Sequence, residues 1–216
     1  MDYGLPVRFG VFITPIATGT PLRLATLADE LGFDILGVQD HPYQRRFFDT
    51  MTLLTPGESV SALEEAIQVI RLLWSGQHGI RFDGMFYQLA GAHSGPVPAH
   101  PIGVWLGAYR PRMLSLVGRL ADGWVPSYGY VKEDELREAN TRIDQAARAA
   151  GRDPRAIRRV LNAGYMEAEQ LIELVVDVGM DTFLVADEEV AMRTFALEVA
   201  PKVRAEVESR RSRRAD

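Results

Sequence analysis

A carboxylate and an imidazole stand together at Asp40 and His41, directly after the short apolar run 36–38 and before Pro42. Proline disfavours helix at the residue before it, so the chain is predicted to turn out of a strand at this point. Polar side chains at the carboxyl end of a buried strand are where α/β proteins usually place their chemistry, and an imidazole exchanges a proton near neutral pH. From these residues alone two interpretations stay open: an acid–base site, or a pair that only caps a turn.

The second candidate site is the stretch 107–112, between a predicted strand and a predicted helix. Gly107 and Ala108 are small, and Arg110 and Arg112 stand near the helix start. Backbone N–H groups at a helix start bind phosphate well, and arginine adds a forked cation. Cations are unfavourable at this end of a helix dipole, so their presence calls for an anion or for another compensation. The alternative is a plain turn with solvated arginines, because no GxGxxG or P-loop pattern is present.

Composition narrows the class of protein. The chain has 216 residues, 47% of them hydrophobic, a formal net charge of -5 and no cysteine. The mild acidity argues against nucleic acid as a partner, and the cysteine count excludes disulfides and thiol chemistry. The N-terminus lacks the pattern of a signal peptide and no run suits a membrane span, so a cytoplasmic soluble protein without a membrane partner is expected. His93 and His100 have no clustered carboxylate, so no metal site is predicted.

Short apolar strands alternate with helical patterns along the chain, which is typical of an α/β protein with a mainly parallel sheet. Six such strands are predicted, at residues 7–14, 33–38, 102–106, 122–127, 158–162 and 181–185. Polar residues gather after the strands, as they do at the mouth of a (β/α)-barrel. A closed barrel of that type needs eight strands. The basic residues 209–216 are predicted to form a frayed tail.

Two junctions interrupt the alternation. A helical pattern ending at Thr55 abuts a new helix start at Pro56, and a strand runs almost directly into a helix near residues 165/166. Asp83-Gly84, between apolar runs 80–82 and 85–89, predicts a β-hairpin with a two-residue turn.

Several short motifs, taken together and in order, resemble those of a known family. They are Gln39-Asp40-His41-Pro42-Tyr43, Asp49-Thr50, Pro56-Gly57-Glu58-Ser59, Trp105-Leu106-Gly107-Ala108 and Ala121-Asp122-Gly123-Trp124. The chain resembles the luciferase-like monooxygenases over nearly its whole length, and most closely their deazaflavin-dependent oxidoreductase branch.

The resemblance implies a TIM (β/α)8-type barrel that binds coenzyme F420, a deazaflavin, or alternatively FMN, in its mouth. It implies that the coenzyme's phosphate tail lies over Gly107, Ala108 and Tyr109, with Arg112 nearby. It also implies that His41 lies beside the reactive ring, with Asp40 as a neighbouring cofactor contact. His41 would then act as acid or base while hydride passes between F420 and a small organic substrate.

The chain departs from the family at the two junctions. The rest of a helix, the third strand, another helix and the fourth strand are absent between Thr55 and Pro56, and a shorter piece is absent near 165/166. Residues 1–216 are therefore predicted to form a single, incomplete barrel domain. Three explanations stay open: the full protein has further residues at each of the two junctions, the deletions are genuine and ligand binding is kept, or the protein is a degraded or engineered copy without activity.

Three functions follow from this. The first is an F420-dependent oxidoreductase, the second an FMN-dependent monooxygenase of the same family, and the third a non-catalytic flavin-binding protein. An incomplete barrel exposes two strand edges, and a homodimer is one way to cover them.

Overall fold

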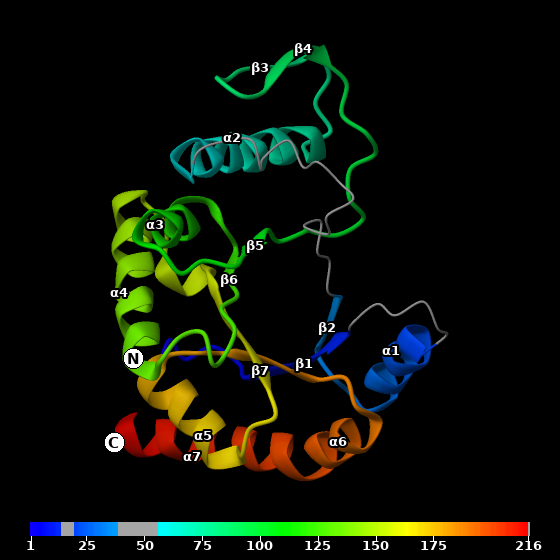
Figure 1. Cartoon of the computed structure of the whole chain (residues 1–216), viewed down its shortest axis with the longest axis vertical. Helices are drawn as coiled ribbons and strands as arrows, with labels where there is room; N and C mark the ends of the chain where they lie inside the picture. The colour runs from blue at the N-terminus through cyan, green and yellow to red at the C-terminus, as the bar shows by residue number, and fades with distance from the viewer. Residues whose placement is uncertain (14–19, 39–55, 216) are drawn as a thin grey trace. The chain divides into compact units, whose positions relative to one another are not determined.

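The computed structural model describes residues 1–13, 20–38 and 56–215 (Figure 1). The chain divides into two compact units, one formed by Met1–Asp40 and Trp105–Asp216 and the other by His41–Val104. The prediction of a single domain over residues 1–216 stays a prediction.

The larger unit is built on a six-stranded sheet in which every neighbouring pair is parallel. Its strands, in chain order, are β1 (Arg8–Ile13), β2 (Ile35–Val38), β5 (Trp105–Leu106), β6 (Gly123–Trp124), β7 (Arg158–Gly164) and β8 (Thr182–Ala186). They lie in the spatial order β2-β1-β8-β7-β6-β5. The predicted α/β class and the six predicted strands are confirmed.

The strand order is that of a TIM-type barrel opened at one place. In a closed barrel each strand lies beside its predecessor in the chain, and the last strand lies beside the first. Here β8 pairs with β1, while β2 and β5 end the sheet. A closed barrel would have two more strands between β2 and β5, its third and fourth. These are the two strands that the family resemblance implies are absent between Thr55 and Pro56. The sheet is a curled half-barrel.

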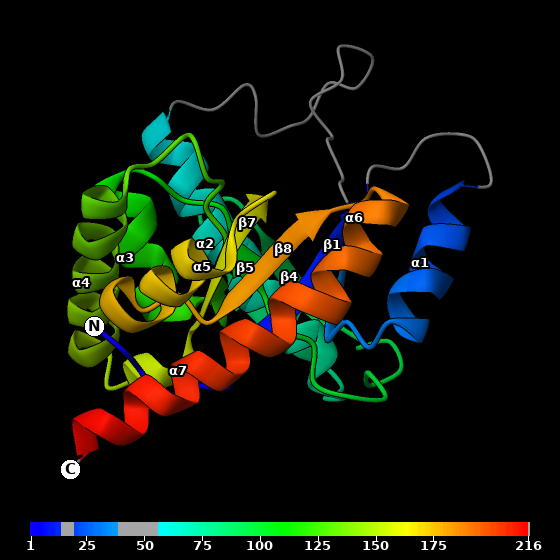
Figure 2. The same ribbon diagram turned by 90° about the horizontal axis from the view of Figure 1, so that it is seen from below.

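Helices connect the strands and cover the sheet (Figures 1 and 2). They are α1 (Thr20–Glu30), α3 (Pro111–Leu120), α4 (Glu133–Ala149), α5 (Ala168–Glu173), α6 (Glu189–Thr194) and α7 (Ala200–Ala215), with π-helical turns at Leu174–Val178 and Phe195–Val199 and a 3₁₀ turn at Pro154–Ala156. The second π turn joins α6 to α7 without a break, and Pro201 is the second residue of α7. Proline has no N–H for the helical ladder.

The core lies between the sheet and the helices. Phe9, Val11 and Ile13 alternate along β1 and are buried. The Phe9 ring meets the Phe195 ring edge-on, with centroids 5.1 Å apart, which joins β1 to the helical segment after β8. In Figure 2, α6 and α7 run along the sheet on this side.

The C-terminal residues differ from the predicted frayed tail, because α7 continues through Ala215. Arg211 donates to both carboxylate oxygens of Asp2 at 2.8 Å and to the Leu5 carbonyl at 3.0 Å. Arg214 pairs with Asp177. These contacts reach residues far away in the chain, which is why the local pattern of the tail did not predict them.

The smaller unit consists of α2 (Pro56–Trp74) and an antiparallel pair, β3 (Ile80–Asp83) and β4 (Gln88–Ala92). The predicted hairpin exists, but its turn is Gly84–Tyr87 rather than Asp83-Gly84. The backbone N–H groups of Met85, Phe86 and Tyr87 donate to the Glu65 carboxylate of α2 at 2.8–3.1 Å. Because these three N–H groups are bound to Glu65, they are not free to extend the ladder between the two strands toward a shorter turn.

Within the described residues, none of the helices is both long and apolar enough to cross a membrane. The described residues also include no group of three or more His, Cys, Asp or Glu side chains placed to hold a metal ion.

Candidate cofactor-binding site

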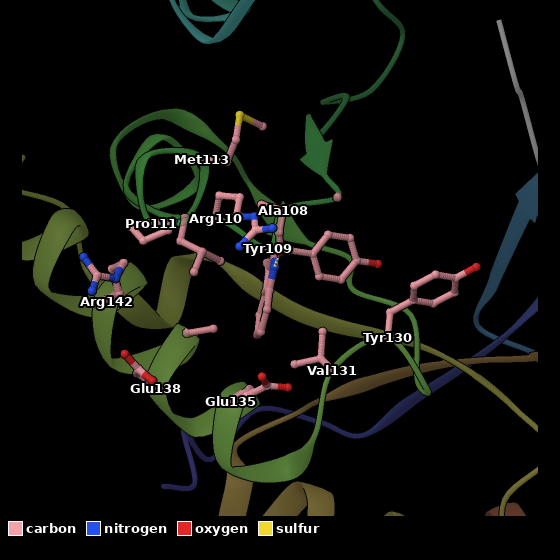
Figure 3. A pocket seen from close by; sticks show the side chains of 14 residues that line it. Ala108, Tyr109, Arg110, Pro111, Met113, Tyr130, Val131, Glu135, Glu138 and Arg142 are labelled. Carbon is pink, nitrogen blue, oxygen red and sulfur yellow. Dashed lines mark hydrogen bonds between the residues drawn. The ribbon is translucent and has the colours of Figure 1, made fainter. Parts of the chain in front are cut away.

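A pocket of about 650 Å³ lies where β5 and β6 deliver the chain into α3 and α4 (Figure 3). Its walls come from the turn between β5 and α3, the first residues of α3, the loop before α4 and one face of α4. Gly107, Ala108 and Tyr109, three of the residues predicted to bind the cofactor, line it. The carboxyl ends of parallel strands are where barrels of this type bind ligands.

The turn between β5 and α3 is fixed by β6. The indole N–H of Trp124 donates to the Ala108 carbonyl at 2.8 Å, and both residues are buried. The Val125 N–H donates to the Leu106 carbonyl at 2.9 Å. The path of the backbone past Gly107 is therefore set before any ligand binds.

Gly107 has no steric reason of its own to be glycine. A Cβ there would meet only the Val125 carbonyl oxygen, at an ordinary 3.5 Å, and the backbone φ is not in the left-handed region. Because Gly107 lines the pocket, the space that a side chain would occupy is left free for a ligand to approach the backbone. The free space at Gly107 would accommodate a coenzyme bound against the turn.

The start of α3 suits an anion. Pro111 is the first helical residue, and no side chain caps the helix, since Arg110 stands at the N-cap without such a hydrogen bond. The first N–H groups of a helix and its dipole both favour negative charge. Arg110 lines the pocket, whereas the exposed Arg112 is not among the lining residues. The cofactor contact of Arg112 stays a prediction.

Two tyrosines, Tyr109 and Tyr130, also line the pocket. The Tyr109 hydroxyl accepts a hydrogen bond from the Ser127 N–H at 3.1 Å, and its ring lies 6.4 Å from that of Tyr130. Tyr130 is 83% exposed and follows Gly129, whose φ is +88°. Figure 3 shows both phenol groups pointing the same way, away from Glu138 and Arg142 of α4.

Tyr130 lies in the polar loop after the predicted strand 122–127, one of the places where polar residues were expected to gather at the barrel mouth. Sequence reasoning missed the contributions of Glu138 and Arg142 to this pocket. Nothing in the polar pattern of α4 indicated which of its charged residues would face a pocket.

Asp40 and His41 lie outside the described residues. The strand that leads to them, β2, ends at Val38 and runs parallel to β5 and β6 in the same sheet. Its carboxyl end therefore lies at the same edge of the sheet as the pocket.

This combination defines a class: an α/β-barrel protein with a ligand pocket at the carboxyl ends of its strands. A sequence model of the luciferase-like monooxygenases matches residues 54–170, and the chain belongs to this family.

Among curated relatives, the phthiodiolone/phenolphthiodiolone dimycocerosates ketoreductase of Mycobacterium sp. (strain JLS) is 31% identical over 163 residues, which are 70% of this chain and 41% of the relative. The F420-dependent glucose-6-phosphate dehydrogenase of Mycolicibacterium smegmatis is 32% identical over 104 residues, 48% of this chain and 31% of the relative. The chain spans less than half the length of each of these relatives.

Solved structures show the same fold. An F420-dependent secondary alcohol dehydrogenase in complex with an F420-acetone adduct superimposes with a TM-score of 0.72 at 14% identity, covering 92% of this chain and 99% of the other. The F420-dependent tetrahydromethanopterin reductase of Methanopyrus kandleri gives 0.71 at 15% identity, covering 91% and 99%.

Proposed function

We propose that this protein is an F420-dependent oxidoreductase that transfers hydride between the deazaflavin and a small organic substrate. Family membership supports this, as do the relatives and fold neighbours named as F420-dependent enzymes. The observation that carries the proposal is Gly107, which leaves the backbone open to a ligand although nothing in the protein requires a glycine there.

The residues have separate roles in this proposal. The turn Gly107–Ala108–Tyr109 and the uncapped start of α3 hold the anionic part of the coenzyme, with Arg112 nearby. The coenzyme supplies the redox chemistry. By the family resemblance, His41 holds or moves the proton that accompanies hydride transfer, and Asp40 is its neighbour and a second cofactor contact.

Two alternative functions are compared with this proposal. An FMN-dependent monooxygenase is supported by fold neighbours such as a riboflavin lyase solved with modified FMN, at a TM-score of 0.68, and the monooxygenase RslO1 from Streptomyces bottropensis, at 0.65. A non-catalytic flavin-binding protein is supported by the two strands missing from the sheet.

The deciding experiment is a pair of fluorescence titrations of the purified protein, one with F420 and one with FMN. The proposal expects saturable F420 binding at lower concentrations than FMN. Tighter FMN binding would favour the monooxygenase, and the absence of binding to either coenzyme would contradict all three functions.

His41→Ala is expected to lower turnover by roughly 10²–10⁴-fold while changing coenzyme affinity only slightly, because a positioned acid or base contributes about that factor to rate. Turnover is measured as oxidation of reduced F420 by a panel of small aldehydes and ketones. His100→Ala, an exposed histidine of the smaller unit, is the matched control. Unchanged turnover in His41→Ala would exclude the role, and no turnover in the unmodified protein would favour the non-catalytic function.

We also propose a homodimer. In the described part of the chain, β2 and β5 are each paired on one side only, and an unpaired strand edge is a template for another chain. Leu36 of β2 is 44% exposed. Light scattering is expected to give the mass of a dimer, and Leu36→Lys to shift it toward monomer. Leu22→Lys, at an exposed site on α1, should leave the mass unchanged. A monomer at all concentrations would contradict the proposal.

A further inference from the structure

The sheet of the larger unit has an inner face, which is the face turned away from α6 and α7 (Figure 2). Along β7, Leu161 and Ala163 belong to the core cluster that packs against the helices. Side chains alternate along a strand, so Asn162 points to the inner face. On β8, Phe183 belongs to the same cluster and its neighbour Leu184 does not. Asn162 therefore lies on the face that lines the interior of a closed barrel.

The backbone of Asn162 is bound on both sides, whereas its side chain is not. Its N–H donates to the Pro126 carbonyl at 2.9 Å, and its carbonyl accepts from the Tyr128 N–H at 2.9 Å. Among the residues that the structure describes, none makes a hydrogen bond to the half-buried Asn162 carboxamide. Asn140, the other asparagine of the chain, donates to a backbone carbonyl and accepts from Arg159. The donors and the acceptor of Asn162 are thus open to a ligand.

A β-bulge follows Asn162 at the carboxyl end of β7. Asn162 pairs with Leu184, but the next pair is Gly164 with Val185, so one residue of β7 is left without a partner. Gly164 has a φ of +64°, in the left-handed region. Bulges redirect side chains and are frequent beside active sites. This one lies at the end of the strands where barrels bind their ligands.

The neighbours of Asn162 on the inner face are apolar. Leu184 lies beside it on β8, and Phe12 of β1 lies beside Leu184, because a Cβ on Gly37 would be 3.0 Å from the Phe12 ring and 3.6 Å from the Leu184 side chain. Arg158 lies at the opposite end of β7, where an aspartate pairs with it. A charge is costly to bury without a partner, so a carboxamide in these surroundings suits an uncharged ligand that carries an oxygen.

We propose that Asn162 binds the oxygen of a neutral ketone substrate and of the alcohol formed from it. This rests on the proposed function, in which hydride passes between the coenzyme and an organic substrate. The carboxamide N–H donates to the ketone oxygen, and its oxygen accepts from the alcohol hydroxyl, so one side chain serves both forms.

The reduction is balanced without a proton from Asn162. The carbonyl carbon gains the hydride, the C=O π electrons move to the oxygen, and the oxygen takes the proton that the proposed function assigns to His41. The coenzyme is oxidised by two electrons. A carboxamide does not ionise near neutral pH, so Asn162 orients the substrate and does not act as the acid.

An NMR titration tests this binding in the absence of turnover. The ¹⁵N-labelled protein with oxidised F420 is titrated with cyclohexanone and, separately, with methylenecyclohexane, in which a CH₂ group replaces the oxygen. The Asn162 side-chain signals, identified by their absence from Asn162→Ala, should shift saturably with cyclohexanone. Asn162→Ala is expected to weaken cyclohexanone binding roughly three- to tenfold, the value of one net hydrogen bond, and to leave methylenecyclohexane within about twofold.

Two further variants complete the test. Asn162→Asp has the same shape but no amide donor, so it should lose at least as much cyclohexanone affinity. Gln145→Ala removes an exposed amide from α4 and should change neither affinity. The dissociation constant of F420 should stay within about twofold in all three variants.

Three results overturn the inference and leave the proposed function standing: equal losses for the two probes in Asn162→Ala, a loss of F420 affinity in that variant, or no cyclohexanone binding to the F420-loaded unmodified protein. Failure of the unmodified protein to bind F420 overturns both.

Discussion

Gly107 is the residue at which protein stability and ligand binding can be separated. The protein around it accommodates a Cβ at 3.5 Å from the nearest atom, so stability does not require glycine. A methyl group there would nevertheless occupy space in the wall of the pocket.

Gly107→Ala is expected to weaken coenzyme binding about tenfold or more, because the added methyl holds the ligand away from the turn. The free energy of unfolding should change by less than about 0.5 kcal/mol, since the site is uncrowded. Fluorescence titration and urea unfolding measure the two effects. Gly95→Ala, where a Cβ meets nothing within 4 Å, is the control. Undiminished coenzyme affinity would mean that the ligand does not approach this turn.

At the scale of elements, the pocket depends on how closely α3 and α4 approach each other. A Cβ on Gly118 of α3 would clash with the Ile143 carbonyl oxygen and would lie 2.7 Å from the Ala146 Cβ of α4. The carboxyl end of α3 is also held, because Arg152 donates to the carbonyls of Gly118 and Ala121 at 2.8 and 2.7 Å. The glycine therefore sets the separation of the two helices that form the pocket walls.

Gly118→Ala is expected to destabilise the protein by roughly 1–3 kcal/mol, the usual cost of inserting a methyl group into a filled space. It should also weaken coenzyme binding, because separating α3 from α4 changes the shape of the pocket that the two helices line. Urea unfolding measures the first effect and titration the second. A variant as stable as the unmodified protein would show that the helices are less tightly packed than the structure has them.

At the scale of the larger unit, the N-terminal segment is joined to α4 and to the start of β7. Arg159 is fully buried and donates to Asn140, Ile157 and Asp144. Its guanidinium lies 4.9 Å from the Tyr3 ring centroid, and the Tyr3 hydroxyl donates to Asp144 at 3.0 Å. This network lies at the amino ends of the strands, away from the pocket, where barrels place stabilising contacts.

Burial raises the pKa of Tyr3 to about 12, and the neighbouring Asp144 adds to the effect while Arg159 opposes it. An unfolded tyrosine has a pKa of about 10. A raised folded-state pKa stabilises the protein fully below pH 10, and this stabilisation is lost as the pH rises through 12.

Tyr3→Phe is therefore expected to be less stable than the unmodified protein by about 1 kcal/mol at pH 8, the value of one net hydrogen bond. The difference should shrink as the pH rises above 10, because only the unmodified protein has this group to ionise. Urea unfolding of both proteins between pH 8 and pH 11 measures the difference. A difference that stays constant over this range would contradict the raised pKa.

The sequence by itself determined the order of the elements and the class of fold. Runs such as 7–14 and 181–185 are apolar enough to be predicted as buried strands from the sequence alone. The stretch 107–112 could be predicted as the turn between a strand and a helix for the same reason, because small residues, a proline and a helix start are local features; that it binds an anion stays a prediction.

The tertiary structure decided the features that depend on contacts between segments far apart in the chain. The hairpin turn shifted because Glu65, on a different element, binds its N–H groups. The C-terminal residues stayed helical because Arg211 reaches Asp2 across the fold. The pocket combines Tyr109 with Tyr130 and Arg142, which are brought together only when β5 pairs with β6 and α3 packs on α4. Contacts between distant segments depend on packing geometry, and the spacing of residues along one segment does not specify it.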